Sequence, residues 1–346
     1  MMMSFNNPQR NVQSWYVAAL SHEVRPGQAI SREFSDRKLA VYRAGDGMAH
    51  VLDARCPHLG ADLSQGEVIG NSLRCAFHHW TFAGDGRCIA IPSLDSIPGF
   101  ARTFSYPAQE KYGAVWFFNG RQPLFPVPCF TGWREDDLLP VHLKPQTINC
   151  HPHVITCNGL DVEHFKTVHR LDFLEEPAIE ELDAFRLRLS LKIRLRRSTA
   201  FERWLRVFAG ETLSATFTTS GGNLATIEGR AGPVPLLVLF SHRPLAGGRS
   251  ASQTFLFASR QRRWKHWLGI DVMLLPALKI IMGHILSKDR ALLDTLKFRT
   301  NLTRADAPLA SFIRQVNAMP VFDSTAAPAD LSDDGRQPPN VVGRGM

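Results

Sequence analysis

The sequence lacks a long uninterrupted hydrophobic run, although 44% of its 346 residues are hydrophobic. Its most apolar stretch, residues 268–286, is interrupted by Asp271, Pro276, Lys279 and His284. Each of these residues would be costly in the hydrocarbon core of a membrane. We therefore expect a buried or amphipathic helix here, and no membrane span. The first eleven residues also lack the apolar core of a secretory signal, so we expect a cytoplasmic protein.

Cysteine is scarce as well, with six residues in the whole chain. Two of them lie in the paired motifs described below. We expect the other four to be ordinary buried thiols, because disulfides are rare in a reducing compartment. These four are Cys88, Cys129, Cys150 and Cys157.

Two kinds of cofactor or partner signature are missing. No G-x-G-x-x-G fingerprint for a dinucleotide is present, so any use of NAD(P)H would need a separate reductase. The net charge is +8, but the basic residues are scattered and no nucleic-acid-binding module is recognisable. An acidic protein partner therefore explains the charge better than a nucleic acid.

Two short stretches combine cysteine with histidine. Cys56-Pro57-His58 and Cys75-Ala76-Phe77-His78 form a C-x-H and a C-x2-H motif, sixteen residues apart. Two thiolates and two imidazoles on two loops suit a Rieske 2Fe-2S cluster, in which a His pair replaces a Cys pair on one iron. The alternative is a structural zinc site, since Cys2His2 also binds zinc. Zinc fingers usually place Cys with Cys and His with His, whereas each loop here supplies one of each, which favours the cluster.

The length and the turn pattern indicate two domains. Residues 14–120 consist of short strand patterns between turn signals, which predicts a small all-β domain that carries both motifs. The clearest strands are expected at residues 38–42, 49–53, 72–75 and 113–118. A Pro-rich connection is expected over residues 121–144.

Residues 145–320 predict a second domain that contains both strands and helices. It opens with strand-like sequence, followed by a helical segment around residues 159–170. Apolar residues then alternate with mostly basic residues from Phe185 to Arg196, which predicts a strand with one buried and one cationic face. The cationic face, or the basic residues 260–265, could dock an acidic partner, although a solvated strand face is the simpler interpretation.

Further strands and one long helix follow in this domain. A curved antiparallel sheet is predicted from strands at residues 212–218, 224–228, 236–241 and 252–258. A helix is predicted over residues 272–302, with an apolar side that includes Leu292, Leu293, Leu296 and Phe298. Residues 321–346 are rich in Pro, Gly, Asp and Ser, which predicts a loose tail.

A second candidate metal site lies in the helical segment. His164 and His169 are five residues apart and can converge on a metal if the helix is distorted or ends between them. By itself such a pair is more often structural. Non-haem iron enzymes bind Fe(II) through two His and one carboxylate, so a distant Asp or Glu should complete the set. Asp289 is the candidate and Asp294 its competitor, and either could instead be a solvated helix charge.

Asp161 precedes His164 by three residues. Its carboxylate can accept the second ring N–H of that His and so fix the tautomer. A cluster imidazole could donate to the same carboxylate, which would give a short polar route between the two centres. The route requires close centres, and a head-to-tail ring of subunits can supply them if one chain holds its own centres too far apart. The simpler role is a helix N-terminal charge stabilised by the helix dipole.

Together these residues resemble the oxygenase component, or α subunit, of the Rieske non-haem iron oxygenases. The resemblance rests on the C-P-H-L-G and C-x-F-H-x-W loops, the N-x2-D-x2-H-x4-H segment and the late K-D-R-A-L-L-D helix, and it covers most of the chain. It is nearest to the small homotrimeric monooxygenases and demethylases, such as dicamba O-demethylase. It implies an α+β fold: an all-β Rieske domain, then a helix-grip catalytic domain with a curved antiparallel sheet and C-terminal helices.

The resemblance assigns roles to individual residues. It implies that Cys56 and Cys75 bind one cluster iron and that His58 and His78 bind the other. It further implies that the mononuclear Fe(II) is bound by His164, His169 and Asp289, that Asp161 bridges His78 of a neighbouring subunit to His164, and that Asn158 is a polar residue near the iron. Two positions depart from the family pattern: Lys288 replaces a Glu, and His79 stands where many members have Gly. We interpret His79 as a packing or hydrogen-bonding variation and not as a further ligand.

The implied activity is oxidation of a small organic substrate with O2 and electrons from NAD(P)H, delivered by a separate reductase with or without a ferredoxin. The pocket should be lined by the sheet and by residues 268–286, with His284 as an isolated polar group. Hydroxylation, demethylation and other oxidations all fit. Two alternatives are an electron-transfer Rieske protein without oxygenase activity and a scaffold that has lost the iron site. Respiratory-type Rieske proteins carry an extra Cys in each cluster loop, and these loops have none.

Overall fold

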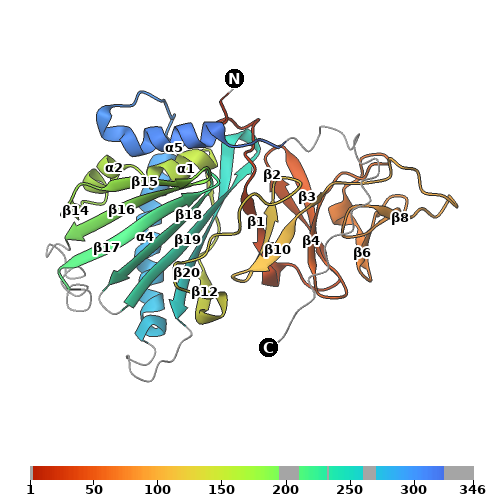
Figure 1. Ribbon diagram of the computed structural model, residues 1–346. Coiled ribbons are helices and arrows are strands. Elements are labelled where there is room, and N and C mark those ends of the chain that lie inside the picture. The colour runs from red at the N-terminus through yellow and green to blue at the C-terminus, as the bar shows by residue number, and fades with distance from the viewer. Residues whose placement is uncertain (1–2, 195–209, 232–233, 260–269, 323–346) are drawn as a thin grey trace, which may run out of the picture.

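The computed structural model describes residues 3–194, 210–231, 234–259 and 270–322. Figure 1 shows an all-β N-terminal part beside a second part in which helices flank a large antiparallel sheet. This arrangement confirms the α+β fold class. Strands β6 (Ser72–Arg74) and β8 (Cys88–Ala90) lie at the end of the molecule that points away from the large sheet (Figure 1).

Three small antiparallel sheets form the N-terminal part. The first has the order β1-β11-β10, with β1 (Trp15–Leu20), β10 (Ala108–Lys111) and β11 (Ala114–Phe118). The second has the order β2-β3-β4-β9, with β2 (Ala29–Phe34), β3 (Arg37–Arg43), β4 (Ala49–Asp53) and β9 (Ser105–Tyr106). The third has the order β5-β6-β7-β8, with β5 (Glu67–Ile69), β6 (Ser72–Arg74), β7 (Thr81–Phe82) and β8 (Cys88–Ala90). Short 3-10 helices are η1 (Ser21–Glu23) and η2 (Leu63–Gln65). All four strands expected here are present, each within one residue of its expected bounds.

A nine-stranded sheet forms the second part. Its main order is β12-β20-β19-β18-β17-β16-β14, and β13 and β15 pair with β20 and β16. The strands are β12 (Leu138–His142), β13 (Gln146–Ile148), β14 (Asp172–Phe173), β15 (Ala178–Asp183), β16 (Arg186–Arg194), β17 (Thr212–Ser220), β18 (Leu224–Ala231), β19 (Val234–Leu245) and β20 (Arg249–Ser259). The 3-10 helices η3 (Glu135–Asp137) and η4 (Ala246–Gly248) precede β12 and β20. Strand β12 therefore lies inside the stretch that we expect to be a connection.

The two parts share a hydrophobic core. Trp116 of β11 is fully buried and stacks on Phe255 of β20, with ring centroids 5.6 Å apart. Trp15 and Val17 of β1 and Phe118 of β11 belong to the same cluster as Leu237 and Phe257. Burial of several large aromatic side chains at one contact contributes on the order of 2 kcal/mol each, so the parts are firmly packed.

Strand β16 shows the expected alternation. Leu187 and Leu189 are fully buried. On the opposite face Arg188 is half-buried, and the exposed basic residues are Arg186, Lys192 and Arg194. Acidic partners neutralise that cationic face: Arg186 pairs with Asp183 at 2.7 Å, and Lys192 with Glu175 at 2.6 Å. The face is thus a solvated, paired strand surface. Residues 195–196 and 260–265 of the proposed docking regions lie outside the described residues.

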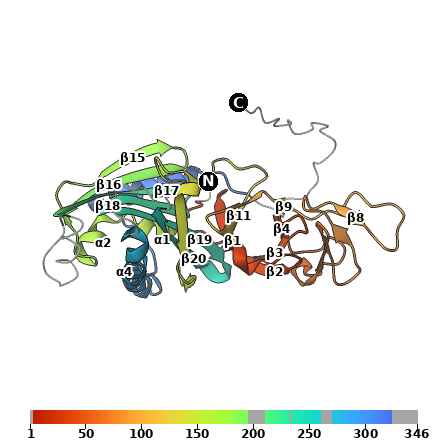
Figure 2. The same ribbon diagram turned by 90° about the horizontal axis from the view of Figure 1, so that it is seen from below.

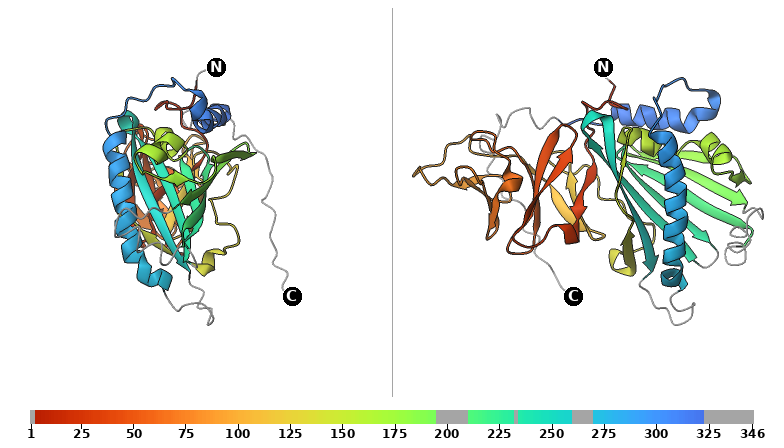
Figure 3. Two further views of the ribbon diagram at one scale, coloured as in Figure 1. Left: turned by 90° about the vertical axis from the view of Figure 1, so that its left-hand side faces the viewer. Right: turned by 180° about the vertical axis from the view of Figure 1, so that it is seen from behind.

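Helix α4 (Ile270–Leu293) lies across one face of the large sheet (Figure 3). The helices α1 (Pro152–Asn158), α2 (Val162–Thr167) and α5 (Ala307–Ala318) gather along one edge of it (Figure 1), and η5 (Arg304–Asp306) precedes α5. Within the described residues, no helix is both long and apolar enough to cross a bilayer.

Three expectations for this part are wrong in detail. The late helix ends at Leu293 and not at residue 302. The Thr295 hydroxyl donates to the Leu292 carbonyl, one of the last carbonyls of the helix that have no helical partner. The expected apolar side forms in part: Leu293 is buried and Phe298 packs against the core, whereas Leu292 and Leu296 are exposed. The expected strand-like opening is present as β13, but helix starts earlier than expected, because α1 begins at Pro152 and not near residue 159. Finally, Cys129 is exposed, whereas Cys88, Cys150 and Cys157 are buried as expected.

Candidate functional site: two metal centres and a cavity

The Cys and His loops are two similar turns at the end of the N-terminal part. The N–H of Gly60 donates to the Cys56 carbonyl, and the N–H of His79 donates to the Cys75 carbonyl. Both thiols are buried, and the rings of His58 and His78 lie 4.6 Å apart. The structure thus brings together all four residues of the paired motifs.

The donor atoms of these loops fit a cluster better than a single ion. The His58 Nδ1 is buried and has no hydrogen-bond partner among the described residues, as expected for a nitrogen kept for a metal. A single tetrahedral zinc would hold its ligand atoms about 3.3–3.8 Å apart, given bonds of about 2.0–2.3 Å. Within the described residues, the only three-residue group whose ligand atoms all lie within 4.8 Å is elsewhere, at His164, His169 and Asp289. The wider spread of the loop ligands is what two bridged irons require.

The two cysteine thiols need a nearby positive charge to ionise. Burial, together with the smaller effect of the nearby Cys75 sulfur, raises the pKa of the Cys56 thiol to about 11. A thiolate pair needs positive charge close by, which iron would supply. The backbone explains why Gly is favoured at the position of His79. The φ angle of His79 is +60°, in the left-handed region that suits Gly, and the equivalent Gly60 in the other loop has a φ of +79°. The His79 side chain is exposed, so it provides no packing.

The second centre is built from α2 and α4. Helix α2 ends at Thr167, between His164 and His169, and Arg170 then adopts a φ of +54°. This ending turns the His169 ring back toward His164, which satisfies the condition set by their spacing. The Nε2 atoms of the two rings lie 3.0 Å apart, and Asp289 Oδ1 lies 3.1 Å and 2.9 Å from them.

These distances match one face of an octahedron. Six-coordinate ions with bonds of about 2.1 Å and right angles separate neighbouring ligand atoms by about 3.0 Å, whereas tetrahedral ligands would be about 3.4 Å apart. Two His and one carboxylate on one face are the Fe(II) donor set that leaves positions open. Burial raises the pKa of Asp289, but the hydrogen bonds and charges of both imidazoles outweigh it, and the net pKa lies below the usual value.

The other proposed residues surround this triad in different ways. Asn158 Nδ2 lies 3.3 Å from the His164 Nε2, so the amide is next to the metal position. Asp161 is the N-cap of α2, and its Oδ1 accepts the backbone N–H of His164 at 2.9 Å. Asp161 therefore has the simpler role, that of a charge at the N-terminus of the helix. Its role as a bridge to a cluster imidazole stays a prediction. Asp294 is turned away: it accepts the N–H of Asn149 and pairs with Arg290.

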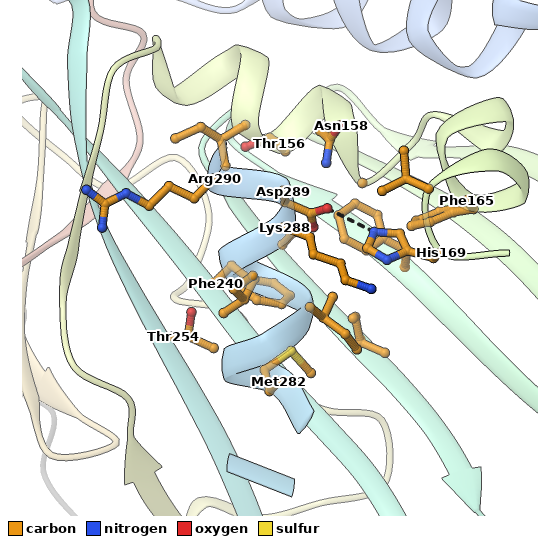
Figure 4. Close-up of a pocket in the computed structure, with 18 of the residues that line it drawn as sticks. Thr156, Asn158, Phe165, His169, Phe240, Thr254, Met282, Lys288, Asp289 and Arg290 are labelled. Carbon is orange, nitrogen blue, oxygen red and sulfur yellow. Dashed lines mark ion pairs between the residues drawn. The ribbon is translucent and has the colours of Figure 1, made fainter. Parts of the chain in front are cut away.

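A cavity of about 740 Å³ opens beside the triad, between α4 and the large sheet. Figure 4 shows Asp289 and His169 at its upper side, with Phe240 and Thr254 rising from the sheet and Met282 from α4. Its walls are mainly aliphatic and aromatic, as expected for a small-molecule site. Gly159 lets α1 approach the wall, because a Cβ there would collide with the Phe217 ring.

The prediction for His284 is wrong. His284 is exposed and is not among the residues that line the cavity. Among the polar wall residues that sequence reasoning missed are His242, Ser252 and Thr254. They lie in ordinary strand sequence, where only the pairing of β19 with β20 brings them together.

The fold and the two donor sets resemble those of the Rieske oxygenases. Residues 14–104 match the model of the Rieske [2Fe-2S] domain, so the chain carries that domain. In fold, the chain is similar to dicamba monooxygenase bound to dicamba, with a TM-score of 0.66, 19% identity, and coverage of 88% of this chain and 95% of that one. The expected resemblance to the Rieske oxygenases is thereby confirmed.

Two curated relatives extend the comparison. The chain is 35% identical to cholesterol 7-desaturase nvd 1 of Ciona intestinalis, over 45% of this chain and 34% of the relative. It is 33% identical to the oxygenase component of 3-ketosteroid-9-alpha-monooxygenase of Rhodococcus rhodochrous, over 47% of this chain and 43% of the relative. The chain thus spans less than half of the length of these two relatives.

Proposed function

We propose that this chain is the oxygenase component of a Rieske-type monooxygenase that oxidises a small or medium-sized organic molecule. The observation that carries the proposal is the combination of a Rieske domain with a separate His164, His169 and Asp289 triad beside a cavity of about 740 Å³. An electron-transfer Rieske protein would need neither the triad nor the cavity. The steroid relatives suggest substrates of steroid size, which such a cavity can hold.

The chain's own residues would perform the binding and orienting steps. Cys56, His58, Cys75 and His78 would hold the cluster, and the triad would hold Fe(II). When bound, these groups supply single electrons and a site for O2 reduction and substrate oxidation. Asn158 would position a polar group at the metal, and the apolar walls would exclude water from the reacting carbon.

Electrons would reach the cluster from NAD(P)H through a separate reductase, with or without a ferredoxin. On the output side of the cluster, the ring of His78 is exposed, so another protein surface could contact it directly. Apolar side chains are also exposed around it: Leu59 is 67% exposed and Phe77 62% exposed. Contiguous exposed apolar residues favour a protein contact, and we assign this one to a neighbouring subunit of a homotrimer.

Metal analysis and one substitution test the proposed function. The purified protein should contain about three irons per chain, whereas a carrier or a scaffold would contain about two. His164→Ala should abolish substrate-dependent NADH consumption with a surrogate reductase and leave the visible Rieske absorption intact. Loss of that absorption, or zinc in place of iron, would count against the two-centre assignment.

A further inference from the structure

A polar pair in the cavity wall has no part in the steps above. His242 of β19 and Ser252 of β20 face each other in the sheet register, and both line the cavity beside the triad. The His242 Nδ1 lies 3.0 Å from the Ser252 Oγ. The hydroxyl therefore fixes the orientation of the ring.

The strand alternation places this pair on the floor of the cavity. Phe240 precedes His242 by two residues and Thr254 follows Ser252 by two, so all four side chains share one face of the sheet. Figure 4 shows Phe240 and Thr254 projecting into the cavity from that face. The Phe240 and His242 rings lie nearly parallel, with an interplanar angle of 16°. An apolar platform with one polar ring thus lies opposite α4.

Burial keeps that ring uncharged. His242 is 4% exposed, and burial lowers its pKa to about 3. The next residue, Arg243, adds no charge to the cavity, because it is on the other face and its Nε donates to the Val17 carbonyl. A neutral imidazole has one N–H donor and one acceptor nitrogen, and Ser252 engages one of these nitrogens. The ring can bond an uncharged oxygen, but it offers no charge to offset the desolvation of a carboxylate.

We propose that His242, oriented by Ser252, binds an uncharged oxygen of the substrate, a ketone or an alcohol on an otherwise apolar skeleton. The inference rests on the proposed function, because it places this contact in the cavity of the iron site. It adds a substrate class, a neutral molecule with one oxygen. That oxygen must lie far enough from the oxidised carbon to reach His242 in the sheet while the carbon faces the triad. The contact would fix which carbon faces the triad.

The cavity also offers a rival chemistry. Lys144, Arg170 and Lys288 line it, and the structure records no ion pair for them within the described residues. Figure 4 shows Lys288 extending from α4 on the side of His169, whereas Arg290 extends to the opposite side. An anionic substrate would use these cations and not His242. All three are exposed, so solvent screens their charges, and we therefore favour the buried pair.

The test compares binding of three probes to the holoprotein under argon, so that no turnover is needed. The probes are androst-4-en-3-one, its parent hydrocarbon androst-4-ene and the matching 3-carboxylic acid, and binding is followed by tryptophan fluorescence. The measured quantity is the ratio of the hydrocarbon Kd to the ketone Kd. His242→Phe should lower this ratio about tenfold, the value of roughly one buried hydrogen bond. Ser252→Ala should lower it less, because the ring is kept but not oriented.

Thr216→Val is the matched control, since it removes another hydroxyl from the same cavity wall and should leave the ratio unchanged. Intact Rieske absorption shows that each variant is folded. If His242→Phe does not fold, Ser252→Ala is the variant that tests the proposal. An unchanged ratio in both variants, no ketone binding to the wild type, or tightest binding of the acid would overturn the proposal. If the ratio of Kd values depends on His242 but the protein lacks a third iron, the contact between His242 and the ligand oxygen is supported and the oxygenase function is contradicted.

Discussion

At the scale of single residues, Asp161 combines two roles that one substitution can separate. Its carboxylate caps α2 by accepting the N–H of His164, and we propose that it also bridges His164 to a cluster imidazole of a neighbouring subunit. Asn caps a helix about as well as Asp, but it carries no charge and its amide nitrogen cannot accept an imidazole N–H. Asp161→Asn should therefore preserve the cap and weaken only the bridge.

We expect Asp161→Asn to retain both metals and a free energy of unfolding within about 0.5 kcal/mol of the wild type. Electron transfer from the reduced cluster to the mononuclear site should be slow in single-turnover measurements. Asp161→Ala should in addition lose about 1 kcal/mol of stability, because the cap is removed. Normal transfer in Asp161→Asn would leave capping as the whole role of this residue.

The third iron ligand can be tested with a matched pair of carboxylates in α4 and just after it. Asp289 lies within 3.1 Å of both imidazoles, whereas Asp294 pairs with Arg290 and accepts the Asn149 N–H. Asp289→Ala should lose the mononuclear iron and keep the cluster, and Asp294→Ala should keep about three irons per chain. Iron content and the Rieske absorption are the measurements. The opposite pattern would reassign the ligand to Asp294.

At the scale of elements, the start of α1 should make stability sensitive to acid. His151 is the N-cap of α1, and its Nδ1 accepts the N–H of His153 at 3.2 Å. Both rings are buried: desolvation lowers the pKa of His151 to about 4 and that of His153 well below its usual value. The unfolded chain binds protons near pH 6.5 that the folded chain does not, so stability should fall as the pH drops below about 6.5.

His151→Asn keeps an N-cap and removes one of these titrations. Between pH 7 and pH 5 the variant should lose about 2 kcal/mol less stability than the wild type, a value that follows from a shift of the folded pKa from about 6.5 to about 4. Urea unfolding at the two pH values measures the difference, and loss of packing in the variant cancels from it. His22→Asn, at an exposed position, is the control. An equal pH dependence in the wild type and His151→Asn would contradict the burial argument.

Elements with a strong period were predictable, and those decided by tertiary packing were not. The alternation of apolar and polar residues correctly predicted β16, because one face of this strand is buried and the other faces solvent. Helix α1 contains Val154, Ile155 and Thr156, which favour strands, and it forms because Pro152 begins it and Gly159 packs against Phe217. The cluster loops and the two iron imidazoles lie in local motifs, so spacing identifies them. Asp289 could be assigned as a ligand only through the family resemblance, because it lies in no motif of its own. His242 lies in no motif either, and only the strand register shows that it belongs to the cavity wall.

At the scale of the whole molecule, the two centres of one chain lie at opposite ends. In Figures 1 and 2 the cluster-bearing hairpins beyond β4 and the helices α2 and α4 are separated by the sheets of both parts. Electron transfer within one chain would have to cross that whole distance. A head-to-tail ring would instead bring the exposed His78 of one subunit to Asp161 and His164 of the next. The proposed mechanism therefore needs transfer between subunits, which the proposed homotrimer would provide.

Mixed oligomers test this requirement. His78→Ala chains lack a complete cluster, and His164→Ala chains lack the iron, so each should be inactive alone. Coexpressed in equal amounts, they should recover about a quarter of the wild-type turnover, because half of the subunits hold iron and half of their neighbours hold a cluster. Transfer within a chain predicts no recovery. The matched control mixes wild type with the double variant: about a quarter of the activity indicates transfer between subunits, and about a half indicates transfer within one chain.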